Sequence, residues 1–283
     1  MRVLVTGATG FTGRHLINVL HARGDEPFAL LADLRDAGGV AAEIASLRPN
    51  AVIHLAAMAF VATSDFDPFY AINQVGSFHL LDALARHVPG IPVLLASSAQ
   101  VYFSGSSGLL DEQAETKPSN HYGLSKFAME LGADFWRDKL RLIIARPFNY
   151  TGVGQDKKYL IPKIVDHFVR GEASIELGNI DVRRDFGDVR SVSHAYVELI
   201  NTPDARGTFN VSTGMLTSVR EIVAMLADIT DNAISISINP DFVRPNDIAV
   251  LGGDNTKLRT ALPDWTPIPL AATLRWMLEQ QTD

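Results

Sequence analysis

The chain has 283 residues, a formal net charge of −7, 47% hydrophobic residues and 20% charged residues. These values are ordinary for an enzyme with one large core, and the absence of a long basic run argues against a nucleic-acid partner. The chain has no cysteine, which excludes disulfides, thiolate zinc sites and cysteine nucleophiles. With no leader-like start and no apolar run of about 18 residues, we expect a cytoplasmic protein without a membrane span or a metal site.

The first half of the chain alternates short apolar runs with segments in which apolar residues recur at helical spacing. The run "RVLVT", for example, is aliphatic and ends at Gly7, which is typical of a strand buried on both faces. Such alternation predicts an α/β fold with a doubly wound parallel sheet covered by helices on both faces. The expected strands are 2–6, 28–31, 51–57, 93–97 and 140–146, and the expected helices are 13–23, 39–47, 68–87 and 122–138.

The interval between the second and third expected strands is short. Residues 32–50 hold only one helical segment, whereas a doubly wound half normally places strand, helix, strand and helix in this interval. We therefore predict that one edge strand and its helix are missing or vestigial, which shortens the second βα unit.

After Arg146 the chain becomes turn-rich and mixes short strands with helices. We expect residues 1–148 to form a dinucleotide-binding domain, and residues 149–283 to form mainly a smaller, mixed substrate lobe from which some segments return to the core. The expected strands of this half are 173–177, 207–212 and 233–238, and its expected helices are 218–230 and 269–281.

A glycine-rich turn, "GATGFTG", follows the first strand and opens the first helix. Gly7 allows the tight turn, Gly10 lets the backbone approach a pyrophosphate, and Gly13 permits close packing of the helix on the strand. The pyrophosphate would lie at the positive N-terminus of the helix. Glycine turns also serve as plain connectors, but this position after the first strand favours a dinucleotide site.

Asp33 stands 20 residues after Gly13, just beyond the second expected strand. A carboxylate there can accept hydrogen bonds from the adenosine ribose hydroxyls, which favours NAD. In the competing interpretation, Asp33 faces the adenine, and Arg14 and Arg35 hold a 2′-phosphate. Both interpretations stay open, and with them the choice between NADH and NADPH.

A serine, a tyrosine and a lysine suggest the chemistry. Tyr122 and Lys126 are four residues apart and so share one face of a helix. The ammonium is expected to lower the pKa of the phenol, ordinarily about 10, and to make Tyr122 a usable acid or base. Lys126 can also bond the nicotinamide ribose. Ser98 ends its strand, where ligands of open parallel sheets collect, and would hydrogen-bond the reacting oxygen.

The motifs "GATGFTG", "HLAA", "SSAQVY", "YGLSK" and "RPFN" occur in this order. Together they resemble the extended short-chain dehydrogenase/reductase (NAD-dependent epimerase/dehydratase) family of nucleotide-sugar enzymes, over essentially the whole chain. The resemblance implies a Rossmann core, NAD(P)H as the cofactor, and Ser98, Tyr122 and Lys126 as the catalytic set. The residues that it implies for cofactor binding are Gly7, Gly10, Phe11, Thr12, Gly13, Arg14, Asp33, Leu34, Leu55, Ala56, Ala57 and Pro147.

The second half carries a more specific resemblance. "RPFNYTGVGQ", "LGNIDVRRDFGDV" and "VRPNDIAVLGGDNTKLR" are similar to the branch of GDP-mannose 4,6-dehydratases and GDP-4-keto-6-deoxy-mannose reductases. The implied substrate is a GDP-sugar, with a thymidine or uridine sugar as the alternative. Fixed arginines suit a diphosphate, whereas Lys163 could equally lie on a solvated helix face. The implied substrate residues are Asn149, Leu160, Lys163, Arg184, Arg244 and Asp247.

The residues after Ser98 distinguish among the reactions of such enzymes. By the resemblance, a 4,6-dehydratase carries its proton-transferring acids at the positions of Ala99 and Gln100, which are poor substitutes for a carboxylate. Epimerase-reductases of the fucose-synthase type use a cysteine, which this chain lacks. We therefore expect NAD(P)H-dependent reduction of the C4 ketone of GDP-4-keto-6-deoxy-D-mannose, giving GDP-D-rhamnose or GDP-6-deoxy-talose.

Two alternatives stay open. A nucleotide-sugar 4-epimerase with tightly bound NAD would use the same Ser98, Tyr122 and Lys126. A non-catalytic Rossmann-type binding or regulatory protein would not need them, so their presence argues against it. Relatives often pair through the helix that carries the tyrosine and through its neighbour, and we therefore expect a homodimer.

Overall fold

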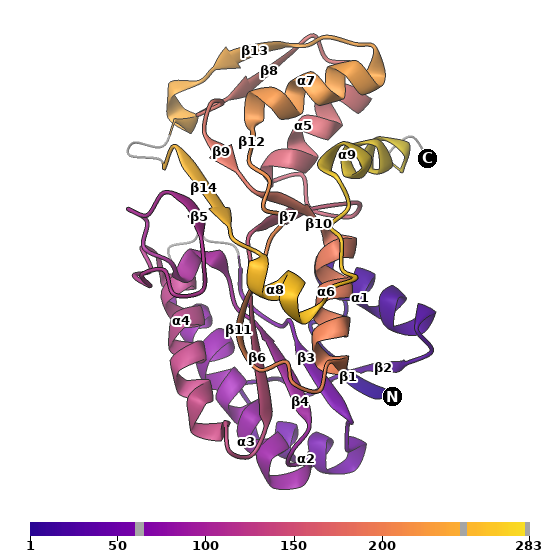
Figure 1. Ribbon diagram of the computed structural model, residues 1–283, viewed down its shortest axis with the longest axis vertical. Helices are drawn as coiled ribbons and strands as arrows, with labels where there is room; N and C mark the ends of the chain where they lie inside the picture. The colour runs from indigo at the N-terminus through magenta and orange to yellow at the C-terminus, as the bar shows by residue number, and fades with distance from the viewer. Residues whose placement is uncertain (60–64, 244–247, 281–283) are drawn as a thin grey trace.

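The computed structural model describes residues 1–59, 65–243 and 248–280. At its centre lies a six-stranded parallel sheet with the strand order β11-β6-β4-β3-β1-β2 (Figure 1). This arrangement confirms the predicted α/β fold with a Rossmann-type parallel sheet. Its strands are β1 (Arg2–Thr6), β2 (Glu26–Ala29), β3 (Ala51–His54), β4 (Pro92–Ala96), β6 (Arg141–Pro147) and β11 (Gly207–Val211).

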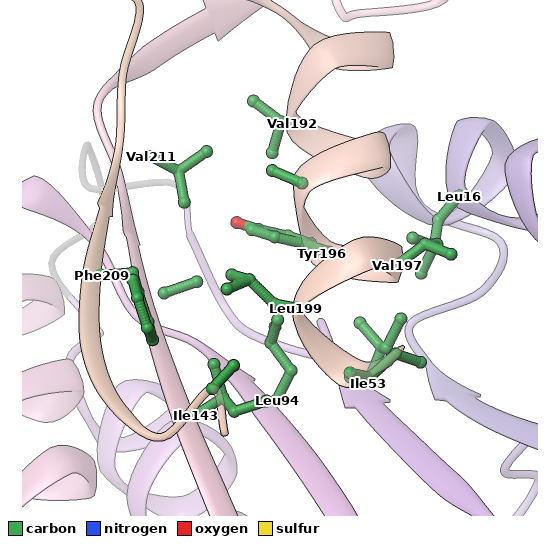
Figure 2. Close-up of a cluster of buried hydrophobic side chains, with 14 of the residues drawn as sticks. Leu16, Ile53, Leu94, Ile143, Val192, Tyr196, Val197, Leu199, Phe209 and Val211 are labelled. Atoms are coloured by element: carbon green, nitrogen blue, oxygen red, sulfur yellow. The ribbon is translucent and has the colours of Figure 1, made fainter. Parts of the chain in front are cut away.

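Helices cover both faces of the sheet because successive strand residues point in opposite directions. Val3 and Val5 belong to one apolar cluster, with α1 (Phe11–Ala22) and α6 (Val189–Asn201), whereas Leu4 belongs to a second cluster on the other face. Figure 2 shows the first cluster, in which side chains of α1 and α6 pack over the central strands. The second face is covered by α2 (Ala37–Leu47), α3 (Ser77–His87) and α4 (His121–Ala133).

The second βα unit is shortened, as predicted. β2 pairs with β1 and ends the order of the main sheet. Residues 30–50, all of them described, hold one helix, α2, before the chain enters β3 next to β1. A doubly wound half with two strands and two helices after β1 would have placed one more strand beyond β2.

A smaller lobe lies above the main sheet in Figure 1 and has its own apolar cluster. Its helices are α5 (Leu160–Val169), α7 (Val219–Thr230) and α9 (Leu270–Glu279). Two pairs of parallel strands belong to it, β8 (Ser174–Leu177) with β13 (Ser235–Ile238), and β7 (Asn149–Thr151) with β10 (Phe186–Asp188).

A mixed four-stranded sheet joins the two halves of the chain. Its strand order is β12-β9-β14-β5. β5, from the first half, pairs with β14, while β11, α6 and the short helix α8 (Thr256–Ala261) return to the core of the main sheet. The division at residue 148 stays a prediction. The strands are β12 (Thr217–Ser218), β9 (Arg183–Arg184), β14 (Val250–Gly253) and β5 (Gly108–Leu110).

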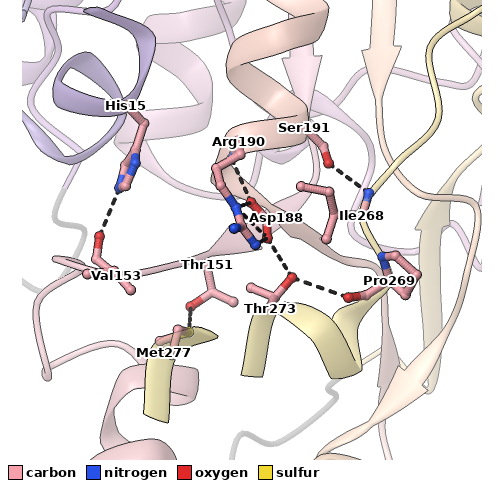
Figure 3. Close-up of polar contacts among 10 residues, drawn as sticks. All are labelled: His15, Thr151, Val153, Asp188, Arg190, Ser191, Ile268, Pro269, Thr273 and Met277. Atoms are coloured by element: carbon pink, nitrogen blue, oxygen red, sulfur yellow. Dashed lines mark hydrogen bonds and ion pairs between the residues drawn. The ribbon is translucent and has the colours of Figure 1, made fainter. Parts of the chain in front are cut away.

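The helix α9 is fixed to the start of α6 by a buried carboxylate (Figure 3). Asp188 accepts a 2.7 Å hydrogen bond from the Arg190 amide, which caps α6, and a second of 2.7 Å from the Thr273 hydroxyl on α9. The Arg190 guanidinium pairs with this carboxylate at 2.6 Å and stacks over the Trp276 ring at 3.8 Å. These contacts attach the end of the described chain to the junction between lobe and core.

Several expected boundaries differ from those observed, among them the end of the helix 122–138 at Ala133, and three bear on the sheet edge and the site. β2 begins and ends two residues earlier than predicted, because the chain leaves β1 after Ala29 and the amides of Leu31 and Ala32 bond the Glu43 carboxylate on α2. β3 ends at His54, before the cofactor-side residues 55–57. The predicted helix 68–87 consists of a π-helical segment, η1 (Phe69–Gly76), that runs directly into α3. None of the described helices has both the length and the apolarity needed to cross a bilayer.

Candidate active site

The glycine turn after β1 has the geometry of a dinucleotide site. Gly7 adopts φ +71°, and a Cβ there would lie 2.8 Å from the Ala56 amide nitrogen. At Gly13 a Cβ would lie 2.2 Å from the Gly7 carbonyl oxygen, and at Gly10 it would lie 3.2 Å from the same atom. Gly7 and Gly13 therefore favour glycine, whereas a Cβ at Gly10 would be a tight contact at an ordinary φ of −69°. The three glycines leave the amides at the start of α1 open to an anion.

Side chains at the start of α1 face the loop that follows β6. The Phe11 ring stacks on Tyr150 with 6.1 Å between ring centroids, and the Thr12 hydroxyl lies 2.9 Å from the Tyr150 hydroxyl. Arg14 donates a 3.2 Å hydrogen bond to the carbonyl oxygen of Gly154. These three predicted cofactor residues thus also connect the glycine turn to the lobe.

Asp33 and Arg35 form an exposed, bidentate ion pair just beyond β2. The closest of its contacts joins Arg35 Nη2 to Asp33 Oδ2 at 2.6 Å. The hydrogen bonds from Arg35 lower the pKa of the Asp33 carboxyl to about 2, so it is ionised at neutral pH. The neighbouring Leu34 is buried, and its carbonyl oxygen lies 2.8 Å from the His79 ring nitrogen on α3. The pair is compatible with either interpretation of the adenosine end.

The remaining predicted cofactor residues lie at the carboxyl ends of the central strands. Leu55, Ala56 and Ala57 follow β3 and are partly buried, and the Ala56 amide donates a 3.1 Å hydrogen bond to the Thr6 hydroxyl. Pro147 ends β6 and is buried. The carboxyl ends of β1, β3 and β6 therefore lie at the same end of the sheet, which is where parallel sheets of this kind bind their ligands.

Ser98 and Tyr122 are brought together by the close approach of α4 to the segment after β4. Ser98 begins the short helix Ala99–Val101, and its Oγ accepts a 3.1 Å hydrogen bond from the Gln100 amide. Tyr122 lies in the first turn of α4, and its phenol is near enough to Ser98 for that side chain to lower its pKa in part. A Cβ at Gly123 would lie 2.4 Å from the Gln100 carbonyl oxygen, so this approach needs glycine.

Lys126 is directed at the sheet. It is 1% exposed, and its Nζ donates a 2.6 Å hydrogen bond to the Ala96 carbonyl at the end of β4. Burial lowers the pKa of Lys126 to about 8, against the raising effect of Glu130. Three predicted residues, Ser98, Tyr122 and Lys126, thus lie where β4 meets α4.

The pKa of Tyr122 moves in the opposite direction to that expected from the sequence. Burial raises the pKa above its ordinary value, Tyr150 and Tyr159 raise it further, and the hydrogen bond with Ser98 lowers it in part. The expectation weighed the Lys126 charge and omitted the loss of water around the phenol. Tyr122 is therefore protonated at neutral pH, which is the form required of a proton donor.

A buried polar network that the sequence analysis missed connects β1, β3 and α3. The Thr6 hydroxyl lies 2.6 Å from His54 Nδ1, and His54 Nε2 lies 2.8 Å from the Ser77 hydroxyl. Ser77 donates its own proton to the Asn73 carbonyl at 2.6 Å, so it accepts from His54 Nε2–H. Burial, followed by the Lys126 charge, lowers the pKa of His54 to about 3, so the ring is neutral.

The Asn73 side chain extends this network to α4. Its Nδ2 donates to the Met58 carbonyl and to the Ser125 hydroxyl, each at 3.0 Å, and its Oδ1 accepts from the Met58 amide at 2.8 Å. Ser125 donates to the Tyr122 carbonyl at 2.8 Å. The network thus ties the cofactor-side loop after β3 to the helix of Tyr122. Polar residues in an otherwise apolar helical segment, "NQVGS", were the available signal.

Of the predicted substrate residues, the four that the structure describes lie on β7, α5 and β9 in the second half. Asn149 Nδ2 donates to the Asp185 carbonyl at 3.3 Å, and Arg184 lies on β9. Lys163 Nζ donates to the Glu176 carbonyl at 3.2 Å and lies 4.7 Å from the centre of the Phe242 ring. Leu160 begins α5 and is exposed. Arg244 and Asp247 lie outside the described residues.

A cavity of about 450 Å³ lies beside these residues in the lobe. Gly178 lies against Phe242, whose ring also contacts Lys163. The cavity residues are Gly178, Asn179, Ile180, Asp181, Val182, Ile238, Val243 and Ala249. Because Val182 is two residues before Arg184, this hollow is a candidate for the nucleotide end of a substrate.

The segment after Ser98 offers no carboxylate. Ala99 is apolar, and the Gln100 side chain accepts a 2.8 Å hydrogen bond from Asn120 Nδ2 at the start of α4. In the part of the chain that the structure describes, no group of three or more His, Asp or Glu side chains could hold a metal ion.

Comparisons with known proteins agree with the motifs. A family model described as GDP-mannose 4,6 dehydratase matches residues 28–269. The GDP-6-deoxy-D-talose 4-dehydrogenase of Aggregatibacter actinomycetemcomitans is 35% identical over 268 residues, which cover 93% of this chain and 91% of that relative. These matches confirm the family expected from the sequence.

Two solved structures are similar along nearly their whole length. RMD from Pseudomonas aeruginosa complexed with NADPH has a TM-score of 0.87 and 31% identity, covering 98% of this chain and 97% of that one. An epimerase candidate from Burkholderia cenocepacia has a TM-score of 0.93 and 43% identity, covering 99% and 97%. The chain therefore belongs to the GDP-mannose 4,6-dehydratase family of extended short-chain dehydrogenases/reductases, and so to the NAD(P)-dependent oxidoreductases.

Proposed function

We propose that the protein reduces the C4 ketone of a nucleotide-linked 4-keto-6-deoxy sugar with NAD(P)H. The proposed substrate is GDP-4-keto-6-deoxy-D-mannose, and the product is GDP-D-rhamnose or its C4 epimer, GDP-6-deoxy-D-talose. The observation that carries the proposal is the placement of Ser98, Tyr122 and Lys126 together where β4 meets α4, without a carboxylate at Ala99 or Gln100. Such a site handles a hydroxyl or ketone but lacks the acid that dehydration needs.

The glycine turn fits a dinucleotide, because a Cβ at Gly7 or Gly13 would collide with backbone atoms, so that only glycine permits this tight turn at the start of α1. We propose that Gly10 and the first amides of α1 hold the pyrophosphate, that residues 55–57 and Pro147 line the nicotinamide half, and that Asp33 or Arg35 meets the adenosine end. The RMD structure with NADPH supports this assignment. When bound, the reduced nicotinamide supplies the hydride.

In the proposed reaction, Tyr122 supplies the proton. As C4 gains a hydride, the electrons of its carbonyl bond move to O4, which takes the phenolic proton of Tyr122. Ser98 donates a hydrogen bond to the same oxygen and so stabilises its developing negative charge. The Lys126 ammonium stabilises the phenolate that remains. The raised pKa keeps Tyr122 protonated until the oxygen of the sugar becomes basic.

The direct test is an assay with GDP-4-keto-6-deoxy-D-mannose and either NADH or NADPH. We expect loss of nicotinamide absorbance and formation of a GDP-6-deoxyhexose. A Tyr122→Phe variant is expected to lose about 100-fold or more in kcat while still binding the cofactor. If the wild-type protein consumes neither cofactor with this substrate, the proposed function is wrong.

A second candidate is a nucleotide-sugar 4-epimerase, which the similarity to the Burkholderia cenocepacia structure favours. An epimerase oxidises and reduces C4 in one cycle and retains NAD throughout. It would therefore purify with bound NAD and convert a UDP- or GDP-hexose to its C4 epimer without added NAD(P)H. The reductase would show neither property.

We further propose that two copies pair through the outer faces of α3 and α4. Leu131 and Phe135, at the end of α4 and just beyond it, are 61% and 86% exposed. Burying such side chains is favourable by about 25 cal/mol per Å² of apolar surface. Light scattering tests this proposal. The wild type is expected to be a dimer, and the Leu131→Glu variant is expected to dimerise more weakly.

A further inference from the structure

Asp185 is a buried carboxylate where the lobe meets the four-stranded sheet. It lies between β9 and β10 and is 0% exposed. Its Oδ1 accepts hydrogen bonds from the amide and the hydroxyl of Thr213, both at 3.0 Å, and its Oδ2 accepts from the Gly214 amide at 2.8 Å. These donors belong to one loop, residues 212–216, which leads from β11 to β12.

Burying Asp185 removes the water that would otherwise solvate its carboxylate, and this loss destabilises the folded protein. Burial raises the pKa of Asp185 to about 6, while the bonds from Thr213, Gly214 and Met215 lower it in part. β14 passes close by, since a Cβ at Gly252 would lie 3.5 Å from the Asp185 Cβ. An apolar residue would avoid this cost, so the carboxylate is best explained by what it holds in place.

The same residue lies between two groups assigned to the substrate. Its carbonyl oxygen accepts the 3.3 Å hydrogen bond from Asn149 Nδ2. The preceding residue, Arg184, pairs with Thr217 of β12 on one side and with Leu251 of β14 on the other. By holding the loop that leads into β12, the Asp185 carboxylate fixes the strand that carries Arg184.

We propose that Asp185 is a positioning residue for the diphosphate of the nucleotide sugar. It does not itself contact the substrate; its carboxylate fixes Arg184 through the 212–216 loop, and its own carbonyl oxygen holds Asn149. This inference rests on the proposed function. It predicts that loss of the carboxylate weakens nucleotide binding and raises KM for the sugar, with little change in kcat or in NADPH binding.

The test is an Asp185→Asn variant, which keeps the shape but presents an N–H to one of the loop donors. Calorimetry with GDP is expected to show affinity reduced by about tenfold or more, with NADPH affinity as in the wild type. Asp228→Asn, an exposed carboxylate of α7 in the same lobe, is the matched control and should leave both affinities unchanged.

A second pair of variants keeps the test informative if the Asp185→Asn protein does not fold. Thr213→Val removes the hydroxyl, which donates to Asp185 and accepts from the Met215 amide, each at 3.0 Å, and keeps the backbone amide donor. It should weaken GDP binding in the same direction, and Thr213→Ser should restore it. Equal GDP affinity in Asp185→Asn and the wild type overturns the inference, as does parallel loss of GDP and NADPH binding in the Thr213→Val variant. A wild-type protein that binds NADPH but no GDP overturns the proposed GDP substrate, and the inference with it.

Discussion

Lys126 on α4 donates a hydrogen bond of 2.6 Å to the carbonyl oxygen of Ala96, two residues before Ser98 on the same segment of chain. The bond places a buried ammonium against the end of β4, while Tyr122 of the same helix lies near Ser98. The helix is thus joined to the strand two residues before Ser98. The charge of Lys126 acts within a buried setting, where electrostatic effects are strong.

The activity is expected to fall above pH 8. Lys126 has a pKa of about 8, below its ordinary value, and so loses its charge as the pH rises through that value. Because the neutral amine stabilises the Tyr122 phenolate less well, kcat/KM for the reduction should decrease there. A pH profile of kcat/KM, which reports groups of the free enzyme, checks this. Lys126→Met should be slower and should lack that inflection; a variant that keeps it would show that another group titrates.

Stability is expected to depend on the neutral state of His54. Its pKa is lowered from 6.5 to about 3 by burial and by Lys126. The unfolded chain takes up a proton below pH 6.5 and the folded chain does not, so the free energy of unfolding should fall as the pH drops from 6.5 towards 3. The slope from this residue is at most about 1.4 kcal/mol per pH unit.

Urea unfolding of the wild type and a His54→Gln variant between pH 4 and 8 measures this contribution. Glutamine can accept from Thr6 and donate to Ser77, so the fold should persist with a loss of about 1–3 kcal/mol at neutral pH. The difference between the two proteins should shrink towards acid. A constant difference over the range would contradict the assigned titration.

Gly123→Ala is expected to impair catalysis more than stability. The added Cβ would lie 2.4 Å from the Gln100 carbonyl oxygen, so α4 must shift away from the segment that carries Ser98. Such a shift should separate Tyr122 from Ser98, lowering kcat by roughly 100-fold at a cost of about 1–3 kcal/mol. Gly38→Ala on α2, where the nearest atom would lie at an ordinary 3.5 Å, is the control. Steady-state kinetics and thermal unfolding of both variants measure the two effects.

Asp33→Asn is expected to shift the cofactor preference towards NADPH. The Asp33 carboxylate is ionised and paired with Arg35 beyond β2. Removing its negative charge leaves the Arg35 guanidinium free to meet a 2′-phosphate and removes repulsion of that phosphate. The ratio of the dissociation constants for NADH and NADPH should rise several-fold. An unchanged ratio would place the adenosine end away from this pair.

Features set by neighbours in the chain were predictable. The spacing of the glycines indicates a tight turn in which some positions cannot carry a side chain. The four-residue interval from Tyr122 to Lys126 indicates that both lie on one face of α4. The short interval between β2 and β3 likewise predicted the missing edge unit, because no second helix could fit in it.

Features set by contacts between distant segments were not predictable. Thr6 and His54 are 48 residues apart, and Asp185 is bonded to Thr213 from 28 residues away. The pKa of Tyr122 depends on its burial and on the distant Tyr150 and Tyr159, which the pattern around residue 122 does not contain. The prediction for this phenol was wrong because one neighbouring charge was considered and the surrounding protein was not.

The interleaving of the two halves limits how this protein can be altered by recombination. The first half donates β5 to the sheet that carries Arg184, and the second half donates β11 to the main sheet. An exchange of everything after residue 148 with a homologue would therefore create two hybrid sheets, each with a foreign pairing strand. Grafting a new sugar specificity onto this scaffold requires matching residues 108–110 and 207–211 to their partners, in addition to the residues that meet the sugar.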